Sequence, residues 1–459
     1  MKTSVALNPH IFRAYDIRGV AESDLGNEVA TAIGRALGTM ARRRGARTFA
    51  VGRDCRLTGP RLAEAITAGL RSTGLDVVDM GAVPTPLLYF SVHHRDLGGG
   101  VQVTGSHNPP EFNGFKMMIG RDTLHGEEIA ELHEMIVAGD FEQGEGALST
   151  DSIEDAYVDW VVDNIRMGER RLRVLVDGGN GIGGPVTMRL LKRLGVDVVG
   201  HCIEPDGTFP NHHPDPTIVE TLDEMREVGA RHGVDLSIGL DGDGDRIGVV
   251  DGNGEILWGD RLLILFSRAI LQTHPGATIV SEVKCSQALF DDIARHGGKP
   301  IMWKAGHSLI KSKMKETGAA LAGEMSGHIF FADRFFGFDD AVYSAARLVE
   351  ILSRGPESLS ERLADVPETF ATPEIRVDCP EETKFLIAPR VAAHVGDRFP
   401  VTDIDGVRVN FGDGWGLVRA SNTQPVLVLR AEATSPERRD EILAQLEEWV
   451  ALFSRPDAP

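Results

Sequence analysis

Hydrophobic and polar positions alternate along most of the chain in the order typical of strands followed by helices. Residues 25–44 have an amphipathic helical pattern, the apolar run at 48–54 predicts a strand, and residues 59–74 predict a second helix. Further strands are predicted at 75–81 and 99–105. This alternation predicts an α/β fold with mainly parallel sheets covered by helices.

The same alternation recurs three times, at a spacing of about 100–150 residues, which is the common size of a domain. After about residue 366 predicted strands dominate, until a terminal helix begins behind Ser435 and Pro436. We therefore expect three successive α/β domains with mainly parallel sheets and a smaller C-terminal α+β domain. The expected ranges are 1–150, 151–253, 254–366 and 367–459, with a glycine-rich linker near 139–150.

Composition excludes several classes of protein. The 459 residues carry 48 basic and 68 acidic side chains, a net charge of −20, and no basic stripe of the kind that nucleic-acid binders show. No apolar run approaches the roughly 20 residues that cross a bilayer, and the N-terminus lacks the apolar core of a signal peptide. We expect a cytoplasmic protein without nucleic-acid or membrane partners, and a monomer, with a dimer as the alternative.

The four cysteines are far apart in the sequence and include no CxxC pair. This spacing argues against a zinc site and against a disulfide scaffold, so we expect reduced and mostly buried thiols. They are Cys55, Cys202, Cys285 and Cys379.

A serine stands among small and polar residues at the end of the strand predicted at 99–105, within the segment 104–109 (TGSHNP). Ser106 can act as a nucleophile if it is activated or already carries a phosphoryl group. The hydrolase motif GxSxG does not match, because Thr104 and Asn108 occupy the glycine positions. The structural alternative is a serine/threonine turn that caps the next element.

Three carboxylates, Asp241, Asp243 and Asp245, alternate with glycines between two predicted strands. On an extended segment alternate side chains point to one side, so the three charges would repel one another unless a cation lies between them. Hard oxygen ligands favour Mg²⁺ or Ca²⁺ over zinc. An EF-hand is excluded, because Arg246 and Gly252 stand where its loop needs glycine and glutamate. The structural alternative is an acidic turn between the strands.

Two further polar loops follow predicted strands in the second half of the chain. Residues 323–328 (GEMSGH) contain Glu324, Ser326 and His328, and a carboxylate beside a hydroxyl can hold the hydroxyls of a sugar. Residues 419–425 (RASNTQP) combine an arginine with two hydroxyls and an amide, a set that can surround a phosphate group. Each loop has a structural alternative, as a polar turn between strands.

Gly179, Gly181 and Gly184 match GxGxxG after a predicted strand, the pattern of a dinucleotide-binding turn. The acidic residue expected about 20 residues later has only Glu204 as a candidate, which lies slightly late. An NAD-dependent dehydrogenase is therefore a remote alternative, and a glycine-rich strand-to-helix turn is the structural one.

The loops at 104–109, 241–246, 323–328 and 419–425, in this order, resemble the four site loops of the α-D-phosphohexomutase family. The likeness covers essentially the whole chain. Three further segments are similar to motifs of that family, namely residues 12–19 (FRAYDIRG), 113–116 (NGFK) and 282–285 (EVKC). Met325 resembles the bacterial phosphomannomutase/phosphoglucomutase branch, whereas the glucosamine branch typically has glutamine there. One departure is Ala305, where threonine is expected.

The resemblance implies four domains around a central cleft, with one loop from each domain at the site. It implies that Ser106 is phosphorylated and that this phosphate binds Mg²⁺ together with Asp241, Asp243 and Asp245. Lys116 and Arg246 would lie near the transferring phosphoryl group, and Lys116 or His307 would act as general base. The residues that would contact the substrate are Tyr15, Arg18, Lys284, His307, Glu324, Ser326, His328, Arg419, Ser421, Asn422 and Thr423.

The activity implied is reversible transfer of a phosphoryl group between O1 and O6 of a hexose phosphate, with a hexose 1,6-bisphosphate as intermediate and activator. Glucose and mannose differ only at C2, so a site that reads the 3- and 4-hydroxyls through Glu324 and Ser326 should accept both sugars. A phosphoglucosamine mutase is the alternative within the same chemistry. A non-catalytic sugar-phosphate sensor is an alternative from another class.

Overall fold

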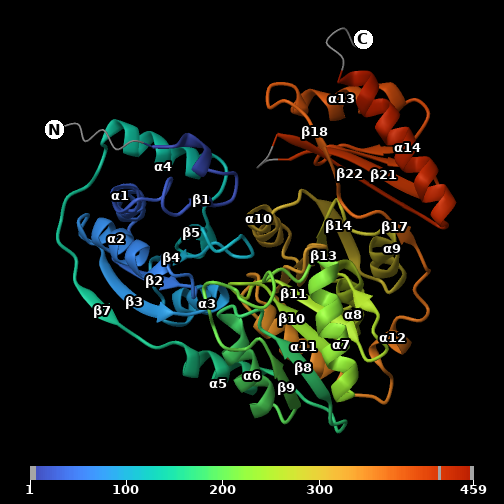
Figure 1. Ribbon diagram of the computed structural model, residues 1–459, viewed down its shortest axis with the longest axis horizontal. Coiled ribbons are helices and arrows are strands. Elements are labelled where there is room, and N and C mark those ends of the chain that lie inside the picture. Colours follow the sequence, from blue (N-terminus) through green and yellow to red (C-terminus); the bar gives the residue numbers. More distant parts are fainter. Residues whose placement is uncertain (1–6, 422–424, 455–459) are drawn as a thin grey trace.

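The computed structural model describes residues 7–421 and 425–454. Within them the chain forms four sheets in sequence order, each with its own helices, arranged around the middle of the molecule (Figure 1). The expected fold class is confirmed, as three α/β units followed by a smaller α+β unit. The exact domain ranges given above remain a prediction.

The first unit is built on a seven-stranded sheet with the order β1-β5-β4-β2-β3-β7, in which β6 pairs with β5. Its elements are the short 3₁₀ helix Pro9–Ile11, β1 (Ile17–Val20), α1 (Asn27–Arg43), β2 (Thr48–Arg53), α2 (Gly59–Arg71), β3 (Asp76–Ala82), α3 (Thr85–His94), β4 (Gly99–Val103), β5 (Phe112–Ile119), β6 (Asp122–Thr123), α4 (Glu127–Ala138) and β7 (Leu148–Thr150). Side chains of β2 alternate between the two faces, so Phe49 and Val51 pack with α1 and α2, whereas Ala50 packs with α3. The expected linker near 139–150 ends in β7, which adds a parallel strand to β3.

The second unit has a five-stranded sheet with the order β12-β11-β10-β8-β9. Its elements are α5 (Glu154–Asn164), β8 (Arg173–Asp177), α6 (Gly183–Arg193), β9 (Asp197–His201), α7 (Val219–His232), β10 (Leu236–Leu240), β11 (Ile247–Asp251) and β12 (Ile256–Leu257). Strand β8 is parallel to β9 and β10, whereas β10 and β11 form an antiparallel hairpin. The turn of this hairpin carries the three aspartates that the sequence singled out.

The third unit has a four-stranded sheet with the order β14-β13-β15-β16. Its elements are α8 (Gly259–Thr273), β13 (Thr278–Glu282), α9 (Gln287–Arg295), β14 (Lys299–Trp303), α10 (His307–Thr317), β15 (Leu321–Gly323), β16 (Ile329–Phe331), α11 (Ala341–Ser353) and α12 (Leu359–Arg362). Strands β13, β14 and β15 are parallel, and β16 returns antiparallel to β15. The turn between β15 and β16 contains Glu324 and Ser326.

The fourth unit is antiparallel, with the order β17-β22-β21-β20-β19 and β18 paired to β22. Its elements are β17 (Phe370–Ala371), β18 (Ile375–Asp378), α13 (Lys384–Val395), β19 (Val401–Thr402), β20 (Val407–Asn410), β21 (Gly414–Ala420), β22 (Val426–Ala433) and α14 (Pro436–Phe453). The expected terminal helix is confirmed, and the Ser435 side chain caps it by accepting a hydrogen bond from the Arg438 N–H. Helix α13 was not expected, and its internal Pro389 is one reason that the pattern was hard to read.

One continuous apolar core joins the first three units. It includes Phe90 of α3, Tyr157 of α5, Leu263 of α8 and Val349 of α11. The fourth unit packs around a separate core formed by α13, α14 and its inner strands. The first three units therefore share one core, whereas the fourth has a core of its own and meets the third through a small apolar cluster of Val283, Trp415 and Leu417.

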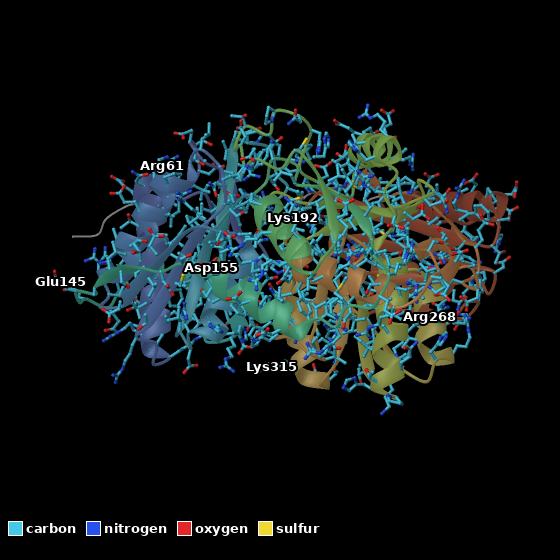
Figure 2. All side chains as sticks on the ribbon, turned by 90° about the horizontal axis from the view of Figure 1, so that it is seen from below. Arg61, Glu145, Asp155, Lys192, Arg268 and Lys315 are labelled. Carbon is cyan, nitrogen blue, oxygen red and sulfur yellow. The ribbon has the colours of Figure 1, made fainter. Side chains whose placement is uncertain are left out.

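Charged side chains cover the outside of the molecule, as Arg61, Asp155, Lys192 and Lys315 illustrate in Figure 2. Within the described part of the chain, no helix combines the length and the apolar character that crossing a bilayer requires. All four cysteines are free thiols, two of them buried and two half-buried.

Asp340 links the second and third units at the start of α11. Its carboxylate accepts hydrogen bonds from the Tyr343 N–H at 2.8 Å and from the Tyr157 hydroxyl at 2.7 Å. Burial raises the pKa of Asp340 to about 7, against the effect of these two hydrogen bonds. Between the ordinary value of about 4 and this value, the folded chain holds a proton that the unfolded chain has released. The contribution of Asp340 to stability therefore falls as pH rises through this window.

We expect Asp340→Asn to increase the free energy of unfolding at pH 8 by about 2–4 kcal/mol, because each pKa unit corresponds to about 1.4 kcal/mol and asparagine stays neutral. The difference from wild type should shrink toward pH 4. Urea unfolding at several pH values measures it, with Asp397→Asn at an exposed position as the control. A difference that does not change with pH would contradict a raised pKa.

Candidate active site

Ser106 lies in the loop that follows β4 and is only 2% exposed. Its N–H donates to Thr104 Oγ1 at 2.8 Å, so the serine/threonine turn considered above does form. The backbone φ of Ser106 is +50°, a strained value for a residue with a side chain. The turn is therefore compatible with a functional role of Ser106, because it directs the hydroxyl into the interior of the protein.

The Ser106 hydroxyl donates to Asp241 Oδ2 at 2.8 Å, although the two residues are 135 positions apart in the sequence. The other oxygen, Asp241 Oδ1, accepts three backbone hydrogen bonds, from Gly244, Asp245 and Arg246, at 3.0–3.1 Å. The segment is thus a turn wrapped around Asp241, and the expectation of an extended segment with alternating side chains was wrong. The three carboxylates still converge, because the turn folds them inward.

Asp241, Asp243 and Asp245 are fully buried, and their ligand oxygens lie within 4.8 Å of one another. Lys116 Nζ, from β5, donates to Asp243 Oδ2 at 2.7 Å and to Asp245 Oδ2. The Oδ1 atoms of Asp243 and Asp245 are buried without a hydrogen-bond partner. Unpaired buried carboxylate oxygens are costly, so this arrangement fits a divalent cation with oxygen ligands.

The pKa shifts of this cluster also indicate that it has too little positive charge for its carboxylates. Burial, followed by the charges of its two neighbours, raises the pKa of Asp241 well above its usual value. Although burial opposes it, Asp243 and Asp245 raise the pKa of Lys116 well above its usual value, which keeps the ammonium charged. One ammonium faces three carboxylates, and a phosphate on Ser106 would add further negative charge. A cation at this place would relieve both repulsions.

The loop of the third unit reaches this cluster through His328. Arg246 Nε donates to His328 Nε2 at 3.0 Å, and the two residues also form an isolated antiparallel bridge. His328 Nδ1 lies 3.3 Å from Asp339 Oδ2, and His307 Nδ1 lies 3.5 Å from the same oxygen. Burial, followed by the charge of Lys311, lowers the pKa of His307 well below its usual value. His307 is therefore a neutral imidazole at neutral pH.

Glu324 and Ser326 lie in the tight turn between β15 and β16. Glu324 Oε1 accepts a hydrogen bond from the Gly306 N–H at 2.7 Å, and its side chain is buried. The Met325 N–H donates to Glu282 Oε1 at 2.9 Å, which fixes the backbone of the same turn. Ser326 is half-buried. The turn thus holds a carboxylate and a hydroxyl on a rigid support.

Three units meet at the peptide of Ala305, the one position that departs from the expected threonine. The Tyr15 hydroxyl donates to the Ala305 carbonyl at 2.9 Å, and the Ala305 N–H donates to Asp405 Oδ2 at 3.1 Å. The same Asp405 oxygen lies 3.0 Å from Arg419 Nη2. Tyr15 and Arg419 are therefore held on either side of the loop that precedes His307.

The remaining predicted residues are placed as follows. Arg18 donates to Asn108 Oδ1 at 2.8 Å, in the serine loop. Lys284 Nζ contacts Glu374 Oε1 at 2.7 Å and lies 3.4 Å from Glu282, which supports the turn of Glu324. Ser421 is buried at the end of β21, and Asn422 and Thr423 lie outside the described residues.

The glycines of the GxGxxG pattern serve close packing beside the aspartate turn. A Cβ atom on Gly181 would lie 2.8 Å from the Gly242 carbonyl oxygen, and one on Gly184 would lie 3.1 Å from the Ile203 carbonyl oxygen. The Ile182 N–H donates to the Gly242 carbonyl at 3.1 Å. The space that a dinucleotide phosphate would need at this turn is thus filled by the turn of Asp241.

The sequence did not point to Arg56, which the structure places under the serine loop. Arg56 is 1% exposed, pairs with Asp54, and donates to four backbone carbonyls. These carbonyls belong to Ser106, Asn108, Pro109 and Phe112. The sequence held one signal for Arg56: it lies in a loop that follows β2, at the same edge of the sheet as the serine loop.

We expect Arg56→Met to lower the free energy of unfolding by about 3–5 kcal/mol, because it leaves the Asp54 carboxylate buried without its partner. The loop of Ser106 should also lose its anchor, because its carbonyls lose the donor that they share. Urea unfolding measures the first effect. The control is Arg43→Met, whose pair with Asp140 is about half exposed and should contribute far less to the free energy of unfolding. We call Arg56 the clamp of the serine loop, because it holds four of the carbonyls at and after Ser106. Equal losses of stability in the two variants would contradict this role.

Models of four domain families match the chain in order. They are described as phosphoglucomutase/phosphomannomutase α/β/α domain I at residues 9–143, domain II at 155–254, domain III at 258–370 and the C-terminal domain at 374–448.

Two curated relatives cover almost the whole chain. A phosphomannomutase/phosphoglucomutase of Pseudomonas syringae pv. tomato is 48% identical over 96% of this chain and 94% of its own length. A phosphoglucomutase of Neisseria gonorrhoeae is 45% identical over 92% and 93%, respectively. A crystal structure of a phosphoglucomutase/phosphomannomutase family protein of Burkholderia thailandensis superposes with a TM-score of 0.92, at 42% identity and 99% coverage of both chains. The chain belongs to the phosphoglucomutase/phosphomannomutase family.

Proposed function

We propose that the protein is a phosphohexomutase that moves a phosphoryl group between O1 and O6 of glucose and mannose phosphates. The observation that carries the proposal is the contact between Ser106 Oγ and Asp241 inside a buried carboxylate trio. A phosphate on a buried serine is stabilised by a cation beside it, and carboxylate and phosphate oxygens are the ligands that Mg²⁺ prefers. Family membership supports the same activity.

The proposed reaction consists of two phosphoryl transfers. In the first, a sugar hydroxyl attacks the phosphorus of phospho-Ser106, the bond between Oγ and phosphorus breaks, and the hydroxyl proton passes to a general base. The product is a hexose 1,6-bisphosphate. The bisphosphate turns around in the site, and its other phosphoryl group returns to Ser106 Oγ while the sugar oxygen takes back a proton. The free bisphosphate can also phosphorylate an unmodified Ser106, and so act as activator.

We assign Mg²⁺ to Asp241, Asp243 and Asp245 together with the phosphate on Ser106. The unpaired Oδ1 atoms of Asp243 and Asp245 support this assignment. When bound, the ion supplies positive charge beside the serine oxygen and the phosphoryl oxygens, where negative charge develops. Lys116, which donates to Asp243, and Arg246, whose guanidinium donates to His328, add fixed positive charge near the same cluster.

Two residues are candidates for the general base. His307 is a neutral imidazole, which supports it as an acceptor at neutral pH. Lys116 is held charged by Asp243 and Asp245, so it could accept a proton only after those carboxylates turn to a metal ion. In this proposal His307 therefore accepts the proton, and Lys116 stabilises the negative charge.

Substrate recognition is proposed to be shared between the third and fourth domains. Glu324 and Ser326 would hold the 3- and 4-hydroxyls, which lie between the two ends of the sugar and suit both of its orientations. Arg419, Ser421, Asn422 and Thr423 would hold the phosphate that is not reacting. The separate core of the fourth domain supports closure over the substrate, which would keep water away from the phosphoserine.

A coupled assay with glucose, mannose and glucosamine 1-phosphates, with and without Mg²⁺, tests the proposal. We expect kcat/KM for the glucose and mannose compounds to agree within about 10²-fold, because Glu324 and Ser326 are assigned to the hydroxyls at C3 and C4, and the two sugars differ only at C2. Glu324→Gln should lower both values by a similar factor of about 10–100, the size of a lost hydrogen bond to a charged group. Rejection of either sugar would overturn the dual specificity, and a preference for the glucosamine compound would favour the alternative mutase.

The proposal includes a cytoplasmic location, since a charged sugar phosphate does not enter a bilayer without a carrier. It includes a monomer as the acting form, because residues of one chain supply all the groups named above. Sedimentation of the purified protein measures the oligomeric state.

A further inference from the structure

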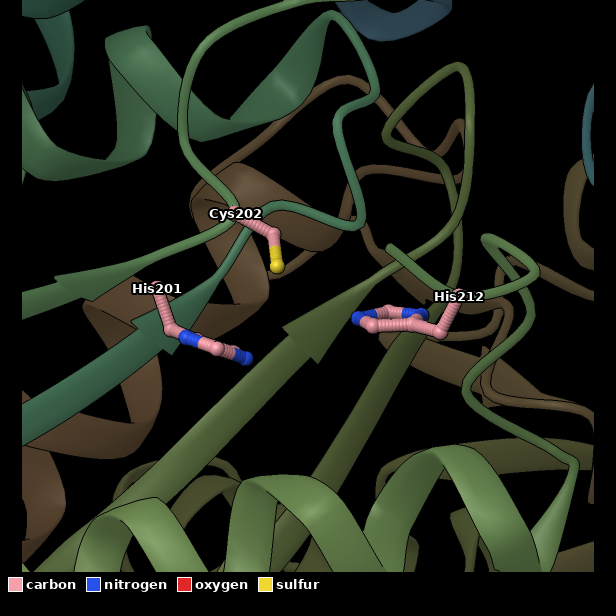
Figure 3. A group of neighbouring side chains, drawn as sticks. All are labelled: His201, Cys202 and His212. Atoms are coloured by element: carbon pink, nitrogen blue, oxygen red, sulfur yellow. The ribbon is translucent and has the colours of Figure 1, made fainter. Parts of the chain in front are cut away.

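A second group of metal-ligating side chains lies outside the active site, in the second unit. In the part of the chain that the structure describes, three groups of histidine, cysteine and acidic residues are close enough to hold a metal, and two of them belong to the aspartate cluster described above. The third consists of His201, Cys202 and His212 (Figure 3). Their ligand atoms lie within 4.8 Å of one another.

The three side chains come from two places in the sequence. His201 ends β9 and Cys202 follows it, whereas His212 comes from the segment that leads toward α7. Figure 3 shows the cysteine sulfur and both imidazole rings turned toward a common space. The His201 and His212 side chains are 22% and 10% exposed, so the group is sheltered but reachable from solvent.

Carboxylates surround this group. His201 Nε2 lies 3.1 Å from Glu224 Oε1, and His212 Nε2 lies 3.0 Å from Asp177 Oδ2. His212 Nδ1 lies 2.9 Å from the carbonyl oxygen of the neighbouring His213, which fixes the plane of the ring. In metal sites the ring nitrogen that does not bind the metal is commonly held by a carboxylate or a backbone carbonyl, as His212 Nδ1 is here. A metal at His212 Nε2 would take the place of the contact with Asp177. The negative charge of the surroundings also favours a cation.

We propose that His201, Cys202 and His212 form a binding site for Zn²⁺. One thiolate and two imidazoles are the donor set that selects zinc over Mg²⁺, which prefers oxygen ligands. Tetrahedral zinc with bonds of about 2.0–2.3 Å places its ligands about 3.5 Å apart, so modest side-chain rotations would close the observed spacing. Binding releases two protons to solvent, the thiol proton of Cys202 and the Nε2 proton that His212 donates to Asp177. Asp177 or a water molecule would complete the coordination.

The position of the site in the fold gives the metal a structural consequence. Zinc bound there would join the end of β9 to His212 and close the loop between them. Within that loop, the Phe209 ring lies 5.1 Å from the Arg56 guanidinium. A Cβ atom on Gly207 would lie 2.4 Å from the Cys55 carbonyl oxygen, so the loop backbone packs directly on the same segment. Bound zinc would therefore stiffen the surface that supports the Arg56 clamp of the serine loop.

The spacing of the cysteines argued against a zinc site, since no CxxC pair is present. Two of the three ligands are histidines, however, and only one cysteine takes part. The expectation from cysteine spacing therefore does not address a site of this composition.

Cobalt(II) is a suitable probe, because a thiolate bound to it gives a charge-transfer band in the near ultraviolet and tetrahedral Co²⁺ absorbs strongly in the visible. The full chain is first saturated with Mg²⁺, so that the aspartate trio is filled, and is then titrated with Co²⁺. We expect one equivalent to develop both absorptions in wild type and added Zn²⁺ to abolish them. Zn²⁺ should also raise the midpoint of thermal unfolding.

Cys202→Ser should lose the charge-transfer band and the thermal shift, and His201→Gln should bind Co²⁺ more weakly. The matched control is Cys55→Ser, because the Cys55 thiol lies nearby and donates to the Asn180 carbonyl at 3.5 Å but is not part of the group. It should keep both signals. No charge-transfer band in wild type, or an equal band in Cys202→Ser, would overturn the proposal. These readouts do not depend on mutase activity.

Discussion

Replacement of Ser106 by alanine is expected to lower mutase turnover by at least about 10³-fold, on the scale that loss of a covalent nucleophile costs an enzyme. The reaction proposed for this chain passes every phosphoryl group through Ser106 Oγ. The other hydroxyl of the turn, that of Thr104, donates to Asp54 and accepts from the Ser106 N–H. A coupled assay of glucose 1-phosphate isomerisation measures the effect. Intact-mass analysis after incubation with glucose 1,6-bisphosphate should show a phosphoryl group on wild type and none on the variant.

The matched control for this experiment is Ser149→Ala, because Ser149 is an exposed serine of β7 in the same domain. It should keep both turnover and phosphorylation. Retained turnover in Ser106→Ala would remove the covalent route. Normal phosphorylation without turnover in wild type would instead favour a sugar-phosphate sensor.

Asp243→Asn is expected to lower Mg²⁺-dependent turnover by at least about 10²-fold. Mutation of a residue that only orients a metal ligand commonly costs about 10–100-fold in affinity or activity, and loss of a ligand itself should cost no less. The substitution is conservative for the fold. Asp243 Oδ2 accepts hydrogen bonds from Lys116 and from the Thr85 hydroxyl, and an asparagine oxygen can keep both. The other oxygen, Oδ1, has no partner, and it is the atom that the amide group would replace.

Asp251→Asn is the control, because Asp251 is buried in the same domain and also has one carboxylate oxygen without a partner. It lies outside the groups that could hold a metal, so its activity and its response to Mg²⁺ should match wild type. Titration of activity with Mg²⁺ in chelator-treated protein measures both variants. Equal Mg²⁺ dependence in wild type and Asp243→Asn would show that Mg²⁺ does not bind to the aspartate trio.

Several features of the protein could be predicted from the sequence because they depend on neighbouring residues. The alternation of apolar and polar positions predicted the strands around Val51 and Val101 and the helices that cover them, since a side chain's face follows from its position in a strand or helix. The Ser435–Pro436 pair marked the start of the terminal helix. The loops at Ser106 and Asp241 could be recognised as candidate sites, because reactive and metal-ligating residue types stand at the ends of predicted strands.

Other features depended on contacts between distant parts of the chain. The sequence contained Ser106 and Asp241 as separate motifs, but the hydrogen bond between them results from packing of two domains. The carboxylates converge through a turn around Asp241 rather than through alternation along a strand, which local patterns do not distinguish. Helix α13, with Pro389 inside it, forms because the sheet of the fourth domain covers its apolar face.

By itself, the sequence determined the order of the elements and the chemistry of each loop, because both follow from local residue types and spacing. The tertiary structure decided which of these groups meet. Arg56 became a clamp only when four carbonyls surrounded it, Lys116 became the partner of two aspartates 127 and 129 residues away, and His212 approached Cys202 only when its loop closed. The physical reason is that charges and hydrogen bonds act over a few ångströms, and folding alone brings such distant residues within that range.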